Sequence, residues 1–144
     1  MGSEPFVTKE RFVKRLSDLC LRSALPGLPK DDVNQQILLK SAVLMLDLSA
    51  VLTEKEVNDK LSIWVREISH IENMDCVTVR RTLVDARYLL RANDGSGYQV
   101  AATESRPGLF DEAINQLNIP EVIAAAREEI AKRKQTYLEK AKKS

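Results

Sequence analysis

The sequence contains few of the residues on which catalytic and metal sites are usually built. Its 144 residues include two cysteines, Cys20 and Cys76, and one histidine, His70. The spacing of these three residues matches no pattern of metal ligands, and no glycine-rich phosphate loop precedes a predicted helix. We interpret the cysteines as small hydrophobic residues and His70 as a helix-end residue. We therefore expect that the chain is not an enzyme and that it holds no metal ion or cofactor.

Long apolar runs and an excess of one charge are also missing. The most hydrophobic stretch, residues 37–52, is interrupted by polar side chains, and a transmembrane helix needs about 18 apolar residues or more. The N-terminus lacks the charged-then-apolar order of a secretory signal. We therefore expect a cytoplasmic protein with reduced cysteines and no membrane contact. The 22 basic and 21 acidic residues give a net charge of +1, which is low for a dedicated nucleic-acid binder.

Helical periodicity predicts two helices in the first third of the chain. The first spans about residues 8–23, with apolar residues repeating at intervals of three and four and Thr8 as its N-cap. The stretch L-P-G-L-P at 25–29 interrupts the helical pattern. The second helix starts at Asp31 or Asp32 and reaches about residue 48. Because it is apolar on nearly all sides, we expect it to be the most buried element.

The third helix has the clearest start signal. The sequence T-E-K-E at 53–56 is a capping box, in which the Thr53 hydroxyl bonds the Glu56 amide and the Glu56 carboxylate bonds back. The helix then runs to about residue 70. Trp64 lies on its apolar face, so we expect core packing for this side chain, with stacking on a nucleic-acid base as the alternative.

A fourth helix over residues 76–86 follows the polar break N-M-D at 73–75. At 100° per residue, four residues fall on its buried side: Val79, Leu83, Cys76 and Ala86. Arg80 and Arg87 fall on the shoulder. Four residues fall on the opposite, outward side: Thr78, Arg81, Thr82 and Asp85.

Two short strand-like segments, 88–91 and 98–100, flank the turn-rich sequence A-N-D-G-S-G and predict a β-hairpin. Helix, break, helix and hairpin follow one another in the order of a winged helix-turn-helix. We therefore predict a mainly α fold with a small β-hairpin wing, in which a winged helix-turn-helix-like core carries flanking N- and C-terminal helices.

The C-terminal part has its own helical pattern. A loop leads to a short helix at 110–117, and Pro120 opens a long last helix at 120–142. Apolar residues from 119 to 138 keep roughly one side of it, which is hard to explain at a free terminus. We expect this stripe to pack on the first two helices or on a second subunit, which would make a homodimer. Its lysine-rich end is interpreted as a solvated face, with phosphate contact as the alternative.

Residues 52–100 also carry long sequence motifs. They contain T-E-K-E-V-N with Leu61, then V-T-V-R-R-T-L-V-D, then D-G with Tyr98. This pattern resembles an uncharacterised prokaryotic family of winged-helix-like domains, whose members occur alone or attached to transcriptional regulators. The resemblance implies nucleic-acid binding. One departure is Arg87, which stands where the family has the glycine of a left-handed helix end, at a cost of about 1 kcal/mol. The other is a longer spacer between Asn58 and Arg80.

We divide the chain into residues 1–51, whose helices pack on the core, the winged-helix-like unit at 52–100, and a helical extension at 101–144, in one compact domain. The predicted structural residues are Thr53, Glu56, Asn58, Arg80 and Asp85. For Arg80 we expect an ion pair, with Glu56 as a candidate partner and nucleic-acid contact as the alternative. Asp85 is expected to cap backbone amides or to pair with Arg81 at a spacing of four.

The predicted nucleic-acid contacts are Thr78, Arg81, Thr82, Arg87 and Arg91. Residues 76–92 hold four arginines and one aspartate, a local net charge of +3 that favours phosphate contact. For Arg81, an ordinary solvated charge is the alternative, and for Tyr88 we weigh stacking on a base. We predict a DNA-binding protein of the transcription-regulator type. The alternative is a protein-interaction module that uses the same scaffold without nucleic acid.

Overall fold

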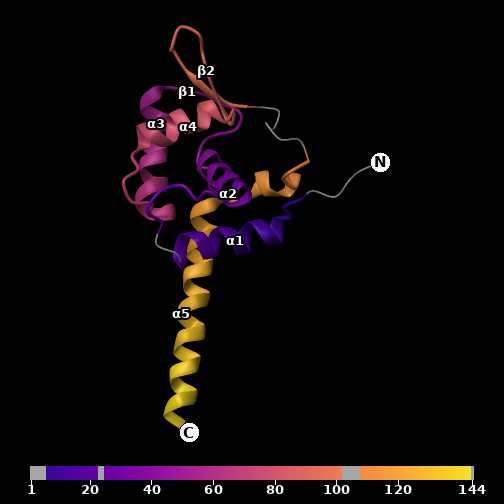
Figure 1. Cartoon of the computed structure of the whole chain (residues 1–144), viewed down its shortest axis with the longest axis vertical. Coiled ribbons are helices and arrows are strands. Elements are labelled where there is room, and N and C mark those ends of the chain that lie inside the picture. The colour runs from indigo at the N-terminus through magenta and orange to yellow at the C-terminus, as the bar shows by residue number, and fades with distance from the viewer. Residues whose placement is uncertain (1–5, 23–24, 102–107, 144) are drawn as a thin grey trace.

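The computed structural model describes residues 6–22, 25–101 and 108–143. In these ranges the chain is mainly helical, with five α-helices and one small antiparallel sheet of three strands. Figure 1 shows the β-hairpin at one end of the molecule and the last helix leaving at the opposite end. None of the described helices combines the length and the apolar character that crossing a membrane requires.

α1 (Lys9–Leu21) starts where the sequence predicts, because Thr8 caps it. The Thr8 hydroxyl accepts a hydrogen bond from the Arg11 amide at 3.2 Å. The buried side of α1 packs on α2, and the ring of Phe12 meets that of Phe110 edge-on, with centroids 5.9 Å apart. α1 therefore joins the core to the segment that precedes the last helix.

α2 (Asp32–Val43) is buried at every position from 36 to 43, as its apolar sequence predicts. The prediction that it continues to residue 48 is wrong. The Asp47 carboxylate accepts hydrogen bonds from the Ser49 amide at 2.9 Å and from the Ser49 hydroxyl at 2.8 Å. This local turn offers the backbone an alternative to the helix, and the chain is then free to form a strand.

α3 (Glu54–Ile63) begins at the predicted capping box, and both of its hydrogen bonds are present. The Thr53 hydroxyl accepts from the Glu56 amide, and the Glu56 carboxylate accepts from the Thr53 amide, each at 3.1 Å. The predicted structural role of both residues is confirmed.

The helical run continues beyond α3 as a π-helical turn, η1 (Trp64–Ser69), and ends at His70 in a left-handed conformation with φ of 52°. Trp64 is fully buried, and its indole N–H donates a hydrogen bond to the Ser41 hydroxyl at 2.9 Å. The core role predicted for Trp64 is confirmed. Its hydrogen bond ties η1 to α2.

α4 (Cys76–Asp85) packs against α3. Its N-cap is Asp75, whose carboxylate accepts a hydrogen bond from the Thr78 amide at 2.8 Å. Val79 and Leu83 are buried, as the helical wheel predicts, whereas Cys76 and Ala86 are only half-buried. Arg80, which the wheel places on the shoulder, is buried as well.

The sheet has the strand order β1-β3-β2. β2 (Leu89–Arg91) and β3 (Tyr98–Val100) form the predicted hairpin. β1 (Val51–Leu52), which was not predicted, pairs antiparallel with β3 and places Val51 opposite Gln99. β1 lies directly before α3, so the sheet links the start of the helix pair to the hairpin that follows it.

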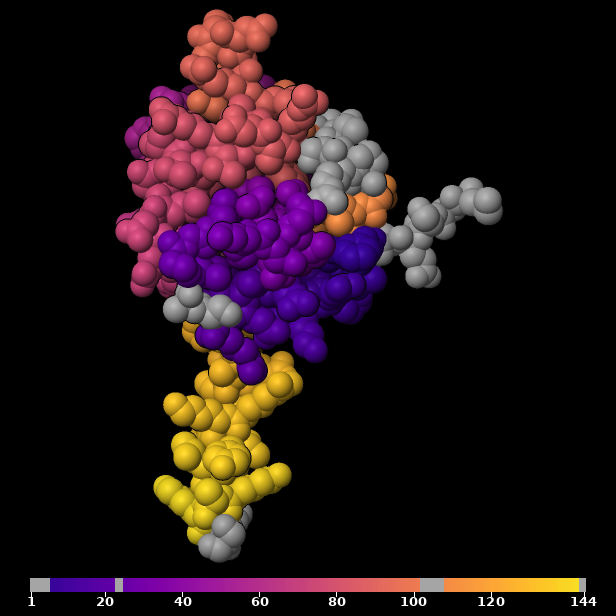
Figure 2. Space-filling model, in the orientation of Figure 1, coloured from indigo at the N-terminus to yellow at the C-terminus, as the bar shows by residue number. Residues whose placement is uncertain are grey.

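The C-terminal segment differs from its prediction in one place. The helix expected at 110–117 is a 3-10 helix, η2 (Glu112–Gln116), which the Asp111 carboxylate caps. α5 (Ile119–Lys143) then runs for 25 residues, as predicted. The sequence predicts that α5 packs on the first two helices or on a second subunit. In the structure α5 packs mainly on α1 and on η1. In Figure 2 the yellow half of α5 extends away from the body.

The two cysteines lie in different environments, and both are free thiols. Cys20 is buried in the core, as predicted, and burial raises the pKa of its thiol to about 12. Cys76 is only half-buried at the first position of α4, so its interpretation as a buried hydrophobe is not confirmed.

Candidate nucleic-acid interface

Arg80 lies on the inner side of α4 and is 9% exposed. Its guanidinium forms an ion pair with Glu54 at 3.1 Å and donates a hydrogen bond to the Asn58 side chain at 2.6 Å. It also lies over the ring of Tyr98, 5.6 Å from the centroid. These contacts connect Arg80 of α4 to α3 and to β3. They agree with the structural role predicted for Arg80 and for Asn58.

The candidate partner named for Arg80 was wrong by two residues. Glu56 uses its carboxylate in the capping box, whereas Glu54 forms the ion pair with Arg80. Both carboxylates lie in the first turn of α3, and only the packing of α4 on α3 decides between them.

The outer side of α4 presents Thr78 and Arg81 to solvent, whereas Thr82 is half-buried. The Thr82 hydroxyl donates to the Thr78 carbonyl at 2.8 Å. Backbone and side-chain hydrogen bonds with Thr78, with a smaller contribution from the charge of Arg81, lower the pKa of the Asp75 carboxyl. Arg81 lies in the middle of α4, is exposed, and forms no ion pair within the described residues.

Arg87 ends α4 in a left-handed conformation, with φ of 65°. The Tyr88 amide donates to the Leu83 carbonyl and the Arg87 amide donates to the Val84 carbonyl, which is the Schellman pattern of a helix end. Glycine is the residue that adopts this conformation without strain. The structure thus supports the physical reason given for a glycine at this position in the family motif. The Arg87 side chain itself is exposed.

Arg91 lies at the end of β2 and is exposed. A Cβ atom on Gly95 would lie 2.9 Å from an Arg91 Nη atom, so the Arg91 guanidinium rests over the hairpin turn. The Asp94 carboxylate accepts a hydrogen bond from the Ser96 amide at 2.9 Å, and hydrogen bonds from Ser96 lower the pKa of that carboxyl. The turn therefore holds one guanidinium and one carboxylate close to its tip.

Within the described ranges, the guanidinium groups of Arg81, Arg87 and Arg91 form no ion pair. Arg80 is the only arginine of this group that is neutralised by direct contact there. The outer surface of α4 and the hairpin thus keeps three positive charges available to a ligand.

Asp85 does not behave as predicted. It is exposed at the end of α4, and in the part of the chain that the structure describes it neither caps a backbone amide nor pairs with Arg81. The carboxylate that interacts with the Arg81 charge is Asp75, at the other end of the helix. Asp85 instead adds one negative charge to the outer surface.

Two buried polar contacts were not anticipated from the sequence. The Tyr88 hydroxyl donates to the Gln36 side chain at 2.5 Å, which ties the end of α4 to α2 and removes Tyr88 from the candidate stacking residues. Lys40 is also buried, with its ammonium over the ring of Phe110 at 5.9 Å. No group of three or more potential metal-ligating side chains occurs among the residues that the structure describes.

Residues 24–100, just over half of the 144-residue chain, match the family described as "Uncharacterized protein conserved in bacteria (DUF2087)". The chain belongs to this family. This confirms the resemblance to an uncharacterised prokaryotic family. No curated protein and no solved structure matches the chain. The DUF2087 match begins well before residue 52 and so takes in α2 and β1, while all of α1 and all of α5 lie outside it.

Proposed function

We propose that this chain binds nucleic acid through the outer side of α4, as a winged helix-turn-helix protein of the transcription-regulator type. In this proposal α3 and α4 are the helix pair and the β2–β3 hairpin is the wing. The order of elements supports it, because β1 precedes the helix pair and joins the hairpin in one sheet. The observation that carries the proposal is the set of three exposed arginines without ion pairs, Arg81, Arg87 and Arg91.

The division of labour between neighbouring side chains also supports the proposal. Arg80 fixes α4 to α3 and β3, so the outer side of the helix has a defined orientation. Arginine is the usual donor to phosphate oxygens and to guanine base edges, and an exposed threonine contacts either. Thr78 would then contact the groove, while Arg81, Arg87 and Arg91 would contact phosphates of the backbone.

A salt-series titration with a random-sequence DNA duplex tests this proposal. Each phosphate contact contributes about 0.9 to the slope of log K against log salt, so three arginines predict a slope of about −2.7. The variants R81A, R87A and R91A should each make the slope shallower by about 0.9. Arg15, exposed on α1, offers the matched control, and R15A should leave the slope unchanged. The absence of duplex binding at low salt would contradict the proposal.

A second candidate function is a protein-interaction module without nucleic acid. It is favoured by the outer face of the sheet, where Val51 is 72% exposed and Leu90 is 51% exposed. Both are paired with Gln99, so the three side chains form one row across the strands. If the duplex does not bind at low salt, this row, with its two exposed apolar side chains, becomes the better candidate contact surface.

A further inference from the structure

α5 consists of two halves with different surroundings. In the first half Ile119 and Ile123 are at most 1% exposed and pack into the core. Beyond Ile130 every described side chain is exposed, including Tyr137 at 74% and Leu138 at 50%. Figure 2 shows this second half standing clear of the body. A helical extension of this length has little stability of its own in water, so two large apolar side chains there call for a partner.

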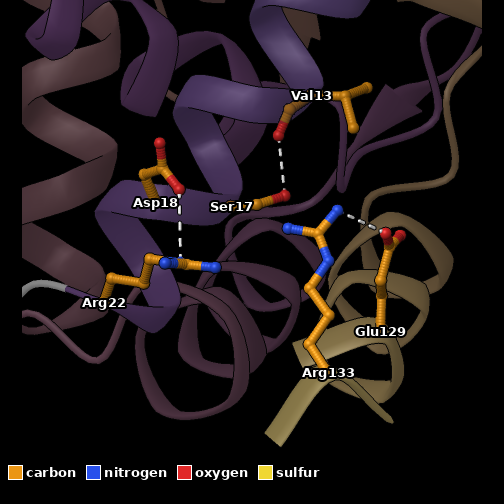
Figure 3. Close-up of polar contacts among 6 residues, drawn as sticks. All are labelled: Val13, Ser17, Asp18, Arg22, Glu129 and Arg133. Atoms are coloured by element: carbon orange, nitrogen blue, oxygen red, sulfur yellow. Dashed lines mark hydrogen bonds and ion pairs between the residues drawn. The ribbon is translucent and has the colours of Figure 1, made fainter. Parts of the chain in front are cut away.

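An open groove of about 890 Å³ lies between α1 and α5, at the place where α5 leaves the body. The floor of the groove is lined by mostly small and apolar side chains: Val13, Ser17, Val122, Ala125, Ala126 and Ile130. The Ser17 hydroxyl donates to the Val13 carbonyl at 2.7 Å, so its hydrogen is used within α1 (Figure 3).

The rim of the groove carries two ion pairs, both visible in Figure 3. Arg22 pairs with Asp18 at 3.5 Å on α1, and Arg133 pairs with Glu129 at 2.8 Å on α5. All four side chains are well exposed, so these pairs are weak and can exchange partners at little cost.

We propose that the projecting half of α5 from a second copy of this chain fills this groove, and that the groove of the second copy receives the first chain in the same way. This inference goes beyond the proposed function and does not depend on it. The arrangement is an isologous contact about a two-fold axis, in which each pairing of residues occurs twice.

Charge decides the relative direction of the two helices. Residues 132–143 hold six basic residues and one acidic residue. A parallel pair would bring these two basic segments together, whereas an antiparallel pair sends the two lysine-rich ends in opposite directions. The antiparallel basic segment then passes the three carboxylates of the groove, Glu10, Asp18 and Glu129, as well as its four basic side chains, Lys9, Lys14, Arg22 and Arg133.

One antiparallel register satisfies both size and charge. It places Tyr137 of one copy on Ala125 of the other, so that the large ring meets a small residue. In the same register Thr136 meets Ala126, and Arg133 meets Glu129. The apolar side chain that is most exposed in the isolated chain thereby covers the floor of the groove.

Two adjacent alanines provide a matched test in the full chain. Ala125 and Ala124 are both exposed on α5, but Ala125 lines the groove and Ala124 lies on another side of the helix. We expect the wild type to form a dimer in sedimentation and light-scattering experiments over a concentration series. A125R should raise the dissociation constant by about tenfold or more, as for the loss of a central contact, and A124R should leave it unchanged. Y137E should likewise raise the dissociation constant, and Q135E, its matched control, should leave it unchanged.

A charge-reversal experiment tests the register in trans. E129R and R133E should each weaken the dimer, because each creates two like-charge contacts. An equimolar mixture of the two variants should restore it, because the mixed dimer regains opposite charges at both positions. A monomeric wild type at all concentrations would overturn the proposal, as would dimers that survive both A125R and Y137E. Equal loss of the dimer in A124R and A125R, or a mixture that stays monomeric, would overturn the register.

Discussion

The inner and outer sides of α4 carry neighbouring residues of the same type with opposite surroundings. Arg80 is 9% exposed and contacts Glu54, Asn58 and Tyr98. Arg81, the next residue, is exposed and forms no ion pair in the described part of the chain. The difference shows how two adjacent arginines on a helix that packs along one side can take different roles. One is held in structural contacts, and the charge of the other stays available to a ligand. A variant that removes the first should change stability, and one that removes the second should change binding.

The largest effect is expected from the apolar centre of the inner side. Leu83 is fully buried, so Leu83→Ala should lower the free energy of unfolding by about 2–5 kcal/mol, because it removes buried contacts and leaves a cavity. Leu90, which is half exposed on β2, is the matched control. Leu90→Ala should stay within about 0.5 kcal/mol in the same denaturant titration. Similar losses for both leucines would contradict this orientation of α4.

Removal of the inner arginine should have the next largest effect. Arg80→Ala is expected to lower the free energy of unfolding by about 1–3 kcal/mol, because the charged hydrogen bond to Asn58 is lost in a mostly buried place. Chemical denaturation measures the change, with Arg15→Ala on α1 as a control that should be close to neutral. An Arg80→Ala variant as stable as the wild type would mean that α4 is held by its apolar contacts alone.

Arg87 should give a change of the opposite sign. Its φ of 65° is unfavourable for any residue with a Cβ atom, so Arg87→Gly should raise the free energy of unfolding by about 1 kcal/mol. Arg87→Ala keeps the Cβ atom and should not gain this stability, which separates backbone strain from the loss of a charge. Thermal unfolding of both variants decides the matter. If both variants are stabilised equally, repulsion between charges is the cause instead.

The smallest change in stability is expected on the outer side. Arg81→Ala should stay within about 0.5 kcal/mol of the wild type, as for an ordinary surface residue. It should instead weaken duplex binding and make the salt slope shallower by about 0.9. If Arg81→Ala binds like the wild type while the wild type does bind DNA, another surface makes the contact.

The N-cap of α4 predicts a pH dependence. The Thr78 amide holds the pKa of the Asp75 carboxyl below its ordinary value of 3.8. The carboxylate therefore stabilises the folded state fully above that ordinary value, and this contribution is lost as the pH falls through the lowered folded-state pKa. The melting-temperature difference between the wild type and Asp75→Ala should be largest near neutral pH and shrink in acid. A difference that stays constant into acid would exclude the charge as its cause.

Local signals made much of the fold predictable from the sequence. The capping box of Thr53 and Glu56 and the glycine-rich turn of the hairpin depend on residues within a few positions of one another. The helical wheel likewise separated Arg80 from Arg81, because a helix with one apolar side has one possible orientation.

The missed features depend on contacts between distant parts of the chain. β1 has only two residues, and it becomes a strand because β3, more than forty positions later, pairs with it. The choice of Glu54 over Glu56 as the partner of Arg80 depends on how α3 and α4 pack. Asp85 was expected to pair within its own helix, but its exposed position offers no such contact in the described structure. The groove beside α5 likewise requires α1 from the other end of the sequence.

The hydrogen bond between Trp64 and Ser41 makes Trp64 an intrinsic fluorescence probe of the core. Trp64 is the single tryptophan, it is fully buried, and its indole N–H is bonded inside the core. Its fluorescence should therefore be shielded from aqueous quenchers and should shift to longer wavelength only when α2 and η1 separate. Fraying of the projecting half of α5 would leave this emission unchanged while lowering the helical circular dichroism. The two signals followed together during heating thus distinguish loss of the arm from loss of the body.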